Sequence, residues 1–180
     1  MWYVIQVSTG KEDSAVSKVR QMLPGGTIQE CFNPCYLVNK KFHGEWKQVR
    51  KSLFPGCVIV DCQEPTAAAA WLKGVEGVMR MLGNGDCPVP LARVESDWIA
   101  RFTTVENRVI GTSSGVIEGD RIVVQEGPLV GLESNIKKID RHKRTAYVEF
   151  DLCGRTVTVA LGLSIVRKTA APATAKAVNV

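Results

Sequence analysis

Basic side chains are concentrated in the stretch IKKIDRHKR, residues 136–144. Lysine and arginine bind phosphate groups, and arginine can also read a guanine edge or stack on an unpaired base. A basic turn of this kind is therefore a candidate RNA-binding element. The alternative is a solvated turn that binds nothing, because charged loop tips are common on protein surfaces. The candidate RNA-binding residues are Lys137, Lys138, Arg141, His142, Lys143 and Arg144, with Arg155 expected to join them from the following hairpin.

The other reactive side chains match no catalytic or metal-binding pattern. The chain has six cysteines and two histidines, and no cysteine pair has the C-x-x-C spacing. Zinc sites usually present paired ligands at that spacing, so we expect no metal and mostly buried, reduced thiols. No glycine-rich phosphate loop is present, and no cysteine lies near a histidine in a nucleophile motif. We expect neither a cofactor nor enzymatic activity.

Composition indicates a folded protein outside the membrane. The 180 residues are 45% apolar and carry a formal net charge of +5, which by itself identifies no partner. The apolar runs are far shorter than the ~20 residues that cross a bilayer. The N-terminal residues show no basic segment followed by an apolar core, so we expect no signal peptide and a cytoplasmic location.

Strand and helix patterns are mixed over residues 1–105, with short connections. A T-x-x-E capping box at residues 9–12 predicts the start of the first helix, and Pro65 favours the start of the second. The mixture predicts an α+β domain with helices against an antiparallel sheet. The expected elements are a strand at 2–7, a helix from 12 to Pro24, strands within 28–62 with a hairpin turn near 43–44, a central strand at 57–62, a helix at 65–73, a strand at 78–82, and a helix at 91–102 with Leu91, Val94, Trp98 and Phe102 on one side.

The pattern changes after residue 105. Residues 106–117 lose periodicity and gain serine, threonine and glycine, which predicts a linker. Residues 118–168 contain five short strand patterns, typical of a small β-barrel, whose closure removes unpaired strand edges. Residues 169–180 are rich in alanine and interrupted by proline, and we expect a disordered tail there.

Several motifs together resemble one known family. WYVIQVSTGKE, LFPGCVIV, GVMRMLG, PVPL, GDRIVVQEGPLVGLESNIKKID and DLCGRTVTVALGLSIV occur in the order found in NusG-type transcription elongation factors. The resemblance covers residues 2 to about 167 and implies an N-terminal NusG domain followed by a KOW domain, an SH3-like barrel. HGEW and the run GPLVGLES with IKKIDRHKR look closest to the LoaP branch of specialised NusG paralogues.

The resemblance implies a factor that acts as a monomer on RNA polymerase. The N-terminal domain would bridge the clamp helices of the largest subunit and the gate loop of the second, the latter contact falling near Thr66–Ala69. LoaP proteins suppress termination on selected operons and recognise a structured element, a hairpin, in the leader RNA with help from the KOW domain. The resemblance also agrees with the absence of enzymatic chemistry.

The apolar surface that meets the clamp helices is implied to include Phe54, Cys57, Ile59 and Gln6. An exposed phenylalanine beside apolar strand residues is costly unless a partner covers it. The alternative is that Phe54 is an ordinary core residue, as large apolar side chains usually are. Family members usually carry tyrosine where this chain has Cys57, so the contact there is expected to be smaller.

Two other functions remain open at this point. One is a housekeeping NusG that acts in pausing and termination and couples polymerase to other factors through its KOW domain. The other is a ribosome-associated RNA-binding module, since KOW barrels also occur in ribosomal proteins.

Overall fold

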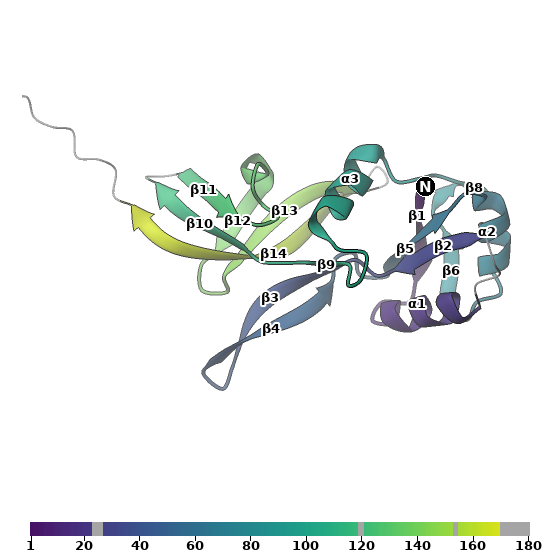
Figure 1. Cartoon of the computed structure of the whole chain (residues 1–180), viewed down its shortest axis with the longest axis horizontal. Helices are drawn as coiled ribbons and strands as arrows, with labels where there is room; N and C mark the ends of the chain where they lie inside the picture. The colour runs from purple at the N-terminus through teal and green to yellow at the C-terminus, as the bar shows by residue number, and fades with distance from the viewer. Residues whose placement is uncertain (23–26, 119–120, 153–154, 170–180) are drawn as a thin grey trace, which may run out of the picture.

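The computed structural model describes residues 1–22, 27–118, 121–152 and 155–169. Its N-terminal half is built on an antiparallel sheet with strand order β2-β5-β1-β6 (Figure 1). The strands are β1 (Trp2–Val7), β2 (Ile28–Phe32), β5 (Cys57–Cys62) and β6 (Val78–Met81). The predicted strands at 2–7 and 57–62 are confirmed, and they pair with each other at the centre of the sheet.

The two faces of this sheet have different coverings. Tyr3, Ile5 and Val7 of β1 are buried against the helices α1 (Glu12–Gln21) and α2 (Pro65–Leu72). Val4 lies on the opposite face because side chains alternate along a strand. That opposite face is turned toward α3 (Arg93–Phe102) and the second half of the molecule (Figure 1).

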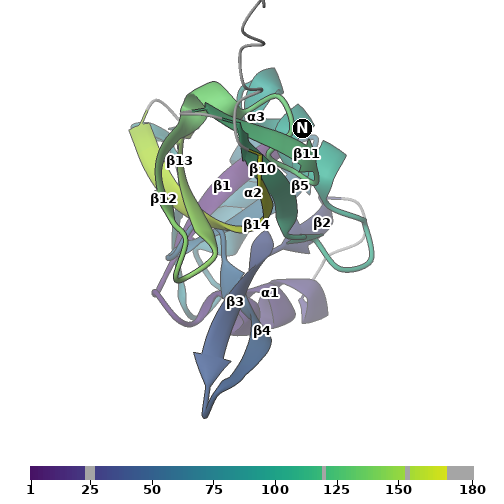
Figure 2. The same ribbon diagram turned by 90° about the vertical axis from the view of Figure 1, so that its left-hand side faces the viewer.

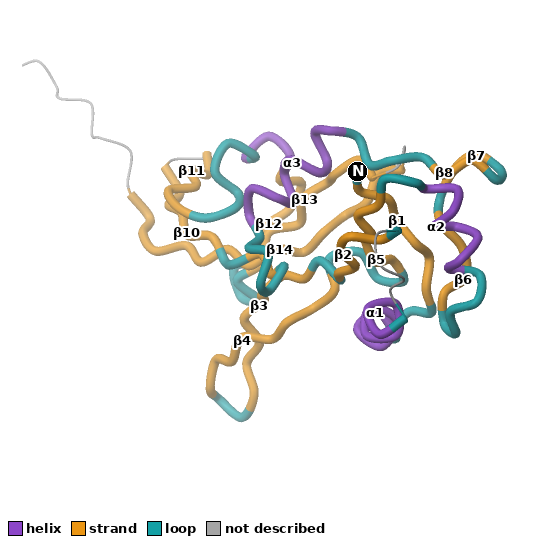
Figure 3. The backbone as a smooth tube through the Cα atoms, turned by 45° about the vertical axis from the view of Figure 1, so that its right-hand side comes forward, coloured by secondary structure: helices purple, strands orange, loops and turns teal. Residues whose placement is uncertain are grey.

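A long hairpin extends from the body of the molecule (Figures 2 and 3). It consists of β3 (Cys35–Phe42) and β4 (Glu45–Ser52), and the short strand β9 (Val109–Ile110) pairs with the start of β3. His43 and Gly44 form the turn with φ angles of 47° and 90°, which confirms the hairpin predicted there.

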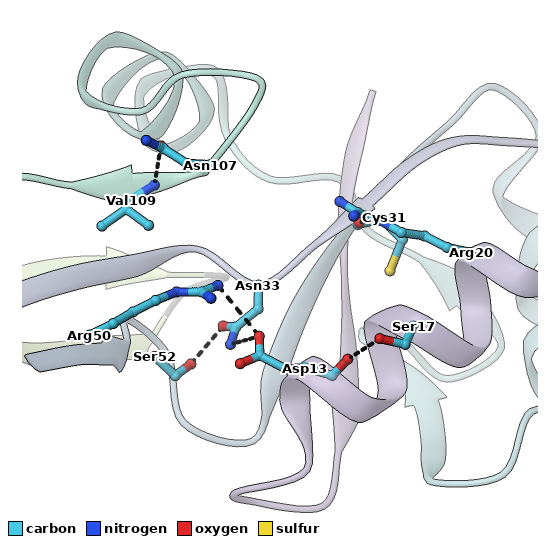
Figure 4. Close-up of polar contacts among 9 residues, drawn as sticks. All are labelled: Asp13, Ser17, Arg20, Cys31, Asn33, Arg50, Ser52, Asn107 and Val109. Atoms are coloured by element: carbon cyan, nitrogen blue, oxygen red, sulfur yellow. Dashed lines mark hydrogen bonds and ion pairs between the residues drawn. The ribbon is translucent and has the colours of Figure 1, made fainter.

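Side-chain hydrogen bonds attach the base of this hairpin to α1 (Figure 4). Asn33 donates from Nδ2 to the Asp13 carboxylate over 3.0 Å, and Ser52 Oγ donates to Asn33 Oδ1 over 2.8 Å. Arg50 Nη2 lies 3.5 Å from the same carboxylate. The hairpin is therefore oriented relative to the main sheet.

Helix α3 begins two residues later than predicted. A small hairpin of β7 (Gly83–Asn84) and β8 (Cys87–Pro88) precedes it. Ile99 is its buried residue, and Trp98 and Phe102 pack beside the core. Val94 lines the same hollow as Trp98, although its side chain is 82% exposed, so it lies at the margin of the apolar side.

Among its described residues, the second half contains five strands joined into one sheet of order β11-β10-β14-β13-β12. The prediction of five strands within 118–168 is wrong, since only four of these strands begin in that range and the fifth begins at Ser113. The strands are β10 (Ser113–Glu118), β11 (Arg121–Glu126), β12 (Ile136–Asp140), β13 (Thr145–Leu152) and β14 (Arg155–Thr169), and a short 3₁₀ helix (Glu133–Asn135) precedes β12. Strand β10 pairs in parallel with β14. Closure of this sheet into an SH3-like barrel remains a prediction. Of the predicted tail at 169–180, Thr169 is the last residue of β14, and residues 170–180 lie outside the described residues.

The segment expected to be a linker, 106–117, carries β9 and most of β10. Arg108 anchors it to the N-terminal half. Its Nε donates to Glu30 over 2.9 Å, a second guanidinium nitrogen bonds the other carboxylate oxygen, and the guanidinium stacks 4.4 Å from the centre of the Phe32 ring. The boundaries of two domains at 105 and 118 remain a prediction.

The two halves of the chain share one hydrophobic cluster. Ile59 and Ile99 from the first half pack in it with Val148 and Leu161 from the second. Strand β14 also approaches β3 so closely that a Cβ added at Gly162 would lie 2.9 Å from the Leu37 carbonyl oxygen. Among the described residues, no helix is long and apolar enough to span a membrane.

Candidate polymerase and RNA interfaces

Three of the four residues predicted to contact polymerase lie on one face of the main sheet. Gln6 of β1 stands directly opposite Cys57 of β5, and Val4 stands opposite Ile59. Cross-strand partners point to the same side, so Gln6, Cys57 and Ile59 share the face that α1 and α2 leave uncovered. The β-pairing therefore brings together residues that are 51 or more positions apart in the sequence.

Phe54 belongs to the same cluster but is not exposed. It is 5% exposed, and Ile59 is 1% exposed. Residues of α3 and of the second half surround a hollow beside Phe54, among them Trp98, Leu132 and Phe150. The expectation that Phe54 is exposed is therefore wrong when the two halves of the chain are in contact. Apolar residues of the second half then cover this side chain.

The loop that carries Phe54 is held by a carboxylate from α1. Glu12 accepts a hydrogen bond from the backbone N–H of Gly56 over 2.7 Å, and Gly56 adopts φ 78°. Burial would raise the pKa of Glu12, but hydrogen bonds from the N–H groups of Gly56, Glu12 and Gly10 outweigh it and lower that pKa. The predicted capping box is wrong, since Glu12 bonds across to the loop and Lys11 is the N-cap.

The basic turn lies between β12 and β13, as predicted. Arg141, His142, Lys143 and Arg144 are all exposed, and Arg144 adopts φ 50°. The carboxylate of Asp140 accepts a hydrogen bond from the Lys143 N–H over 2.9 Å, which shapes the turn. That bond is the main cause of the lowered pKa of Asp140.

The other three residues predicted to bind RNA lie outside the turn itself. Lys138 lies on β12 opposite Tyr147, next to the turn, while the Lys137 ammonium lies 3.4 Å from the Glu149 carboxylate. Arg155 pairs with Leu152, at the far end of β13 from Thr145. Seven residues of extended strand span roughly 23 Å, so the prediction that Arg155 joins the basic turn is wrong.

Sequence reasoning missed the N-terminal hairpin as a neighbour of this turn. The Arg144 guanidinium lies 4.4 Å from the centre of the Trp46 ring, although the two residues are 98 positions apart. The stretch KKFHGEWKQVRK combines lysines with exposed aromatic residues. This composition is the sequence signal for the hairpin as part of the site.

The cysteines are consistent with the prediction of mostly buried thiols. Cys31, Cys35 and Cys62 are buried, and burial raises the pKa of Cys31 to about 12. Cys57 is half-buried and Cys87 is exposed, while Cys153 lies outside the described residues. Among the described residues, no group of three or more histidine, cysteine, aspartate or glutamate side chains is placed to hold a metal ion.

Known proteins resemble this chain over most of its length. NusG of Thermus thermophilus, a transcription termination/antitermination protein, is 25% identical and the match covers 93% of this chain and 97% of that protein. The protein of the same name from Chlamydia pneumoniae is 28% identical, with 88% of each chain covered. The solved structure of Thermotoga maritima NusG superposes with a TM-score of 0.54 at 22% identity, covering 89% of this chain and 92% of that one.

The family comparison extends over more than half of the chain. Residues 1–100 match the family model described as transcription termination factor nusG. These are the residues that form the main sheet, its helices and the β3–β4 hairpin. The chain belongs to the NusG family.

Proposed function

We propose that this protein is an operon-specific transcription antitermination factor of the LoaP type. It binds RNA polymerase as a monomer through its N-terminal half and a structured leader-RNA hairpin with help from its second half. The observation that supports RNA binding is the exposed basic turn, in which Asp140 is engaged by Lys143 while Arg141, His142 and Arg144 present their side chains to solvent.

The proposed polymerase contact is the shared sheet face of Gln6, Cys57 and Ile59, with Phe54 beside it. These side chains would meet the clamp helices of the largest subunit, and Thr66–Ala69 of α2 would lie toward the gate loop of the second. Because the second half of the chain now covers part of this face, the two halves must separate before polymerase can bind there. A sulfhydryl at Cys57 offers less contact area than the usual tyrosine.

The first test is single-round transcription with the host polymerase. The template carries the leader of the adjacent operon followed by an intrinsic terminator, and the readout is the fraction of transcripts that read through. We expect the protein to raise readthrough only when the leader is present. Leader-independent pausing or termination would overturn the proposal and favour the housekeeping role, and co-purification with ribosomes in place of polymerase would favour a ribosomal role.

The basic turn is tested by charge reversal. Replacing Lys138, Arg141 and Arg144 with glutamate should abolish leader-RNA binding and leave the circular dichroism spectrum unchanged, since these side chains lie outside the core. The matched control reverses Lys11, Lys73 and Arg93, which are exposed residues at the ends of helices α1, α2 and α3, and should bind RNA nearly as the wild type does. Equal RNA binding by both triple variants would show that the basic turn is not the site.

A further inference from the structure

A groove runs between the β3–β4 hairpin and the turn that joins β12 to β13. The two elements lie side by side in Figures 1 and 2. The groove is lined by Lys40, Lys41, Trp46, Lys51, Lys143 and Tyr147, among other residues. Beyond Tyr36, β3 has no partner strand on the side opposite β4 among the described residues.

The groove is strongly basic on both walls. The hairpin contributes Lys40, Lys41 and Lys51 to the lining, and the turn contributes His142 and Lys143. The acidic residues of these two segments are Glu45 and Asp140. Both acids already lie near lysines, since Glu45 is 3.9 Å from Lys47 and Asp140 is 3.5 Å from Lys143. The lysines along both elements therefore favour an anionic ligand.

Aromatic side chains accompany this charge. Trp46 is 39% exposed and Phe42 is 44% exposed, both near the tip of the hairpin. Their exposure costs free energy unless a ligand covers them. The carboxylates of an acidic peptide would pair with the lysines but would not stack on the aromatic rings. Unpaired nucleotides supply both phosphates for the lysines and flat bases for the rings. A continuous duplex would pair with the lysines through its phosphates but would not cover the aromatic rings, because its bases are already stacked on one another.

We propose that this groove holds a short unpaired segment of RNA. Lys40, Lys41, Lys51 and Lys143 contact its phosphates, and one base stacks on Trp46, where the Arg144 guanidinium now lies 4.4 Å from the ring centre. Arginine also stacks on bases, so Arg144 and Trp46 can hold the base between them. The inference rests on the proposed RNA-binding function and adds the N-terminal hairpin as the second half of the site.

The test measures fluorescence anisotropy of the full-length protein with labelled oligouridine of about 10 nucleotides, a length within the usual range for single-strand sites. Trp46→Ala should weaken binding about tenfold, because stacking on one aromatic side chain typically contributes a factor of this order. Lys40→Glu with Lys41→Glu should also weaken binding and reduce the salt dependence by about two phosphate contacts.

Matched controls are available in the same chain. Trp71→Phe changes a tryptophan on α2, and Lys11→Glu with Lys73→Glu changes the net charge by the same amount away from the groove. Both controls should bind oligouridine as the wild type does. A blunt RNA duplex of matched length should be insensitive to Trp46→Ala.

The outcomes separate this inference from the function on which it rests. RNA binding can be lost in the basic-turn variant but unchanged in the Trp46 and Lys40/Lys41 variants. In that case the proposal that the groove binds RNA is overturned, and the Arg144–Trp46 contact is only structural. The proposed function still stands. If the wild type binds no RNA, both are overturned. Tighter binding to oligodeoxythymidine than to oligouridine, or equal loss of duplex binding in Trp46→Ala, would also overturn the assignment to unpaired RNA.

Discussion

At the scale of single residues, Glu12 links helix α1 to the loop beneath the proposed polymerase face. Its carboxylate is buried and accepts the Gly56 N–H over 2.7 Å. The same loop is held by hydrogen bonds from Val7 N–H to the Gly56 carbonyl and from Cys57 N–H to the Phe54 carbonyl. Losing the negative charge of Glu12 would weaken a charge-assisted hydrogen bond at the point where Phe54 is positioned.

Glu12→Gln should lower the free energy of unfolding at pH 7 by about 1 kcal/mol, since a neutral acceptor replaces a charged one. The pKa of Glu12 is lowered in the folded protein, so its contribution is present above the unfolded pKa and is lost as the pH falls through the folded pKa. Urea denaturation should therefore show a difference between variant and wild type that shrinks below about pH 4.5. Glu64→Gln, at an exposed position, is the control, and a difference that stays constant down to pH 3 would contradict this account.

At the scale of elements, α3 and β13 form one of the contacts that join the two halves. The rings of Trp98 and Phe150 lie 4.4 Å apart between centres, and Phe102 packs on Trp98 at 5.8 Å. The buried Trp98 Nε1 has no hydrogen-bond partner among the described residues. An unsatisfied buried donor typically costs about 1–3 kcal/mol, so this contact is less stabilising than its area suggests.

Phe150→Ala should loosen the docking of β13 on α3, because it removes an aromatic pair worth about 1 kcal/mol beyond its burial. Hydrogen exchange by mass spectrometry should show faster exchange in α3, with no change in β1 and β5 at the centre of the main sheet. Val130→Ala, at a side chain that is 41% exposed, is the control. Unchanged exchange in α3 would show that other contacts determine the docking.

At the scale of the whole molecule, the packing of the second half of the chain against the first has two consequences. It covers the face that carries Phe54 and Ile59, and it brings the basic turn against the β3–β4 hairpin. Separation of the halves would expose the first surface and divide the groove. The proposed polymerase-bound and groove-bound states are therefore alternatives for a single chain, and their balance depends on the free energy of docking.

Weakening the docking should accordingly strengthen binding to polymerase. If only a tenth of the chains are undocked, the apparent affinity is reduced about tenfold, so Phe150→Ala should recover up to that factor. Biolayer interferometry with immobilised core polymerase measures the apparent affinity of each variant. Val130→Ala again serves as the control. Equal affinity of Phe150→Ala and wild type, together with faster exchange in α3, would mean that polymerase binds elsewhere.

Local patterns were sufficient for the regular elements. Short, largely apolar runs predicted β1 and β5, and Pro65 marked the start of α2. The His43-Gly44 turn was recognised from its residue types. Each of these features depends on neighbours within a few positions. The errors involve longer distances. Glu12 bonds a loop 44 residues away, and the strand register places Arg155 at the end of β13 that is far from the basic turn.

The sequence by itself determined the family, the order of the elements and the basic turn, since motifs and charge are properties of the chain alone. Only the tertiary structure decided that Phe54 is covered and that Arg144 meets Trp46 across 98 residues. Both follow from how β13 and β14 pack on α3 and β3. Such packing is set by the combined shape of many side chains, which no short stretch of sequence contains.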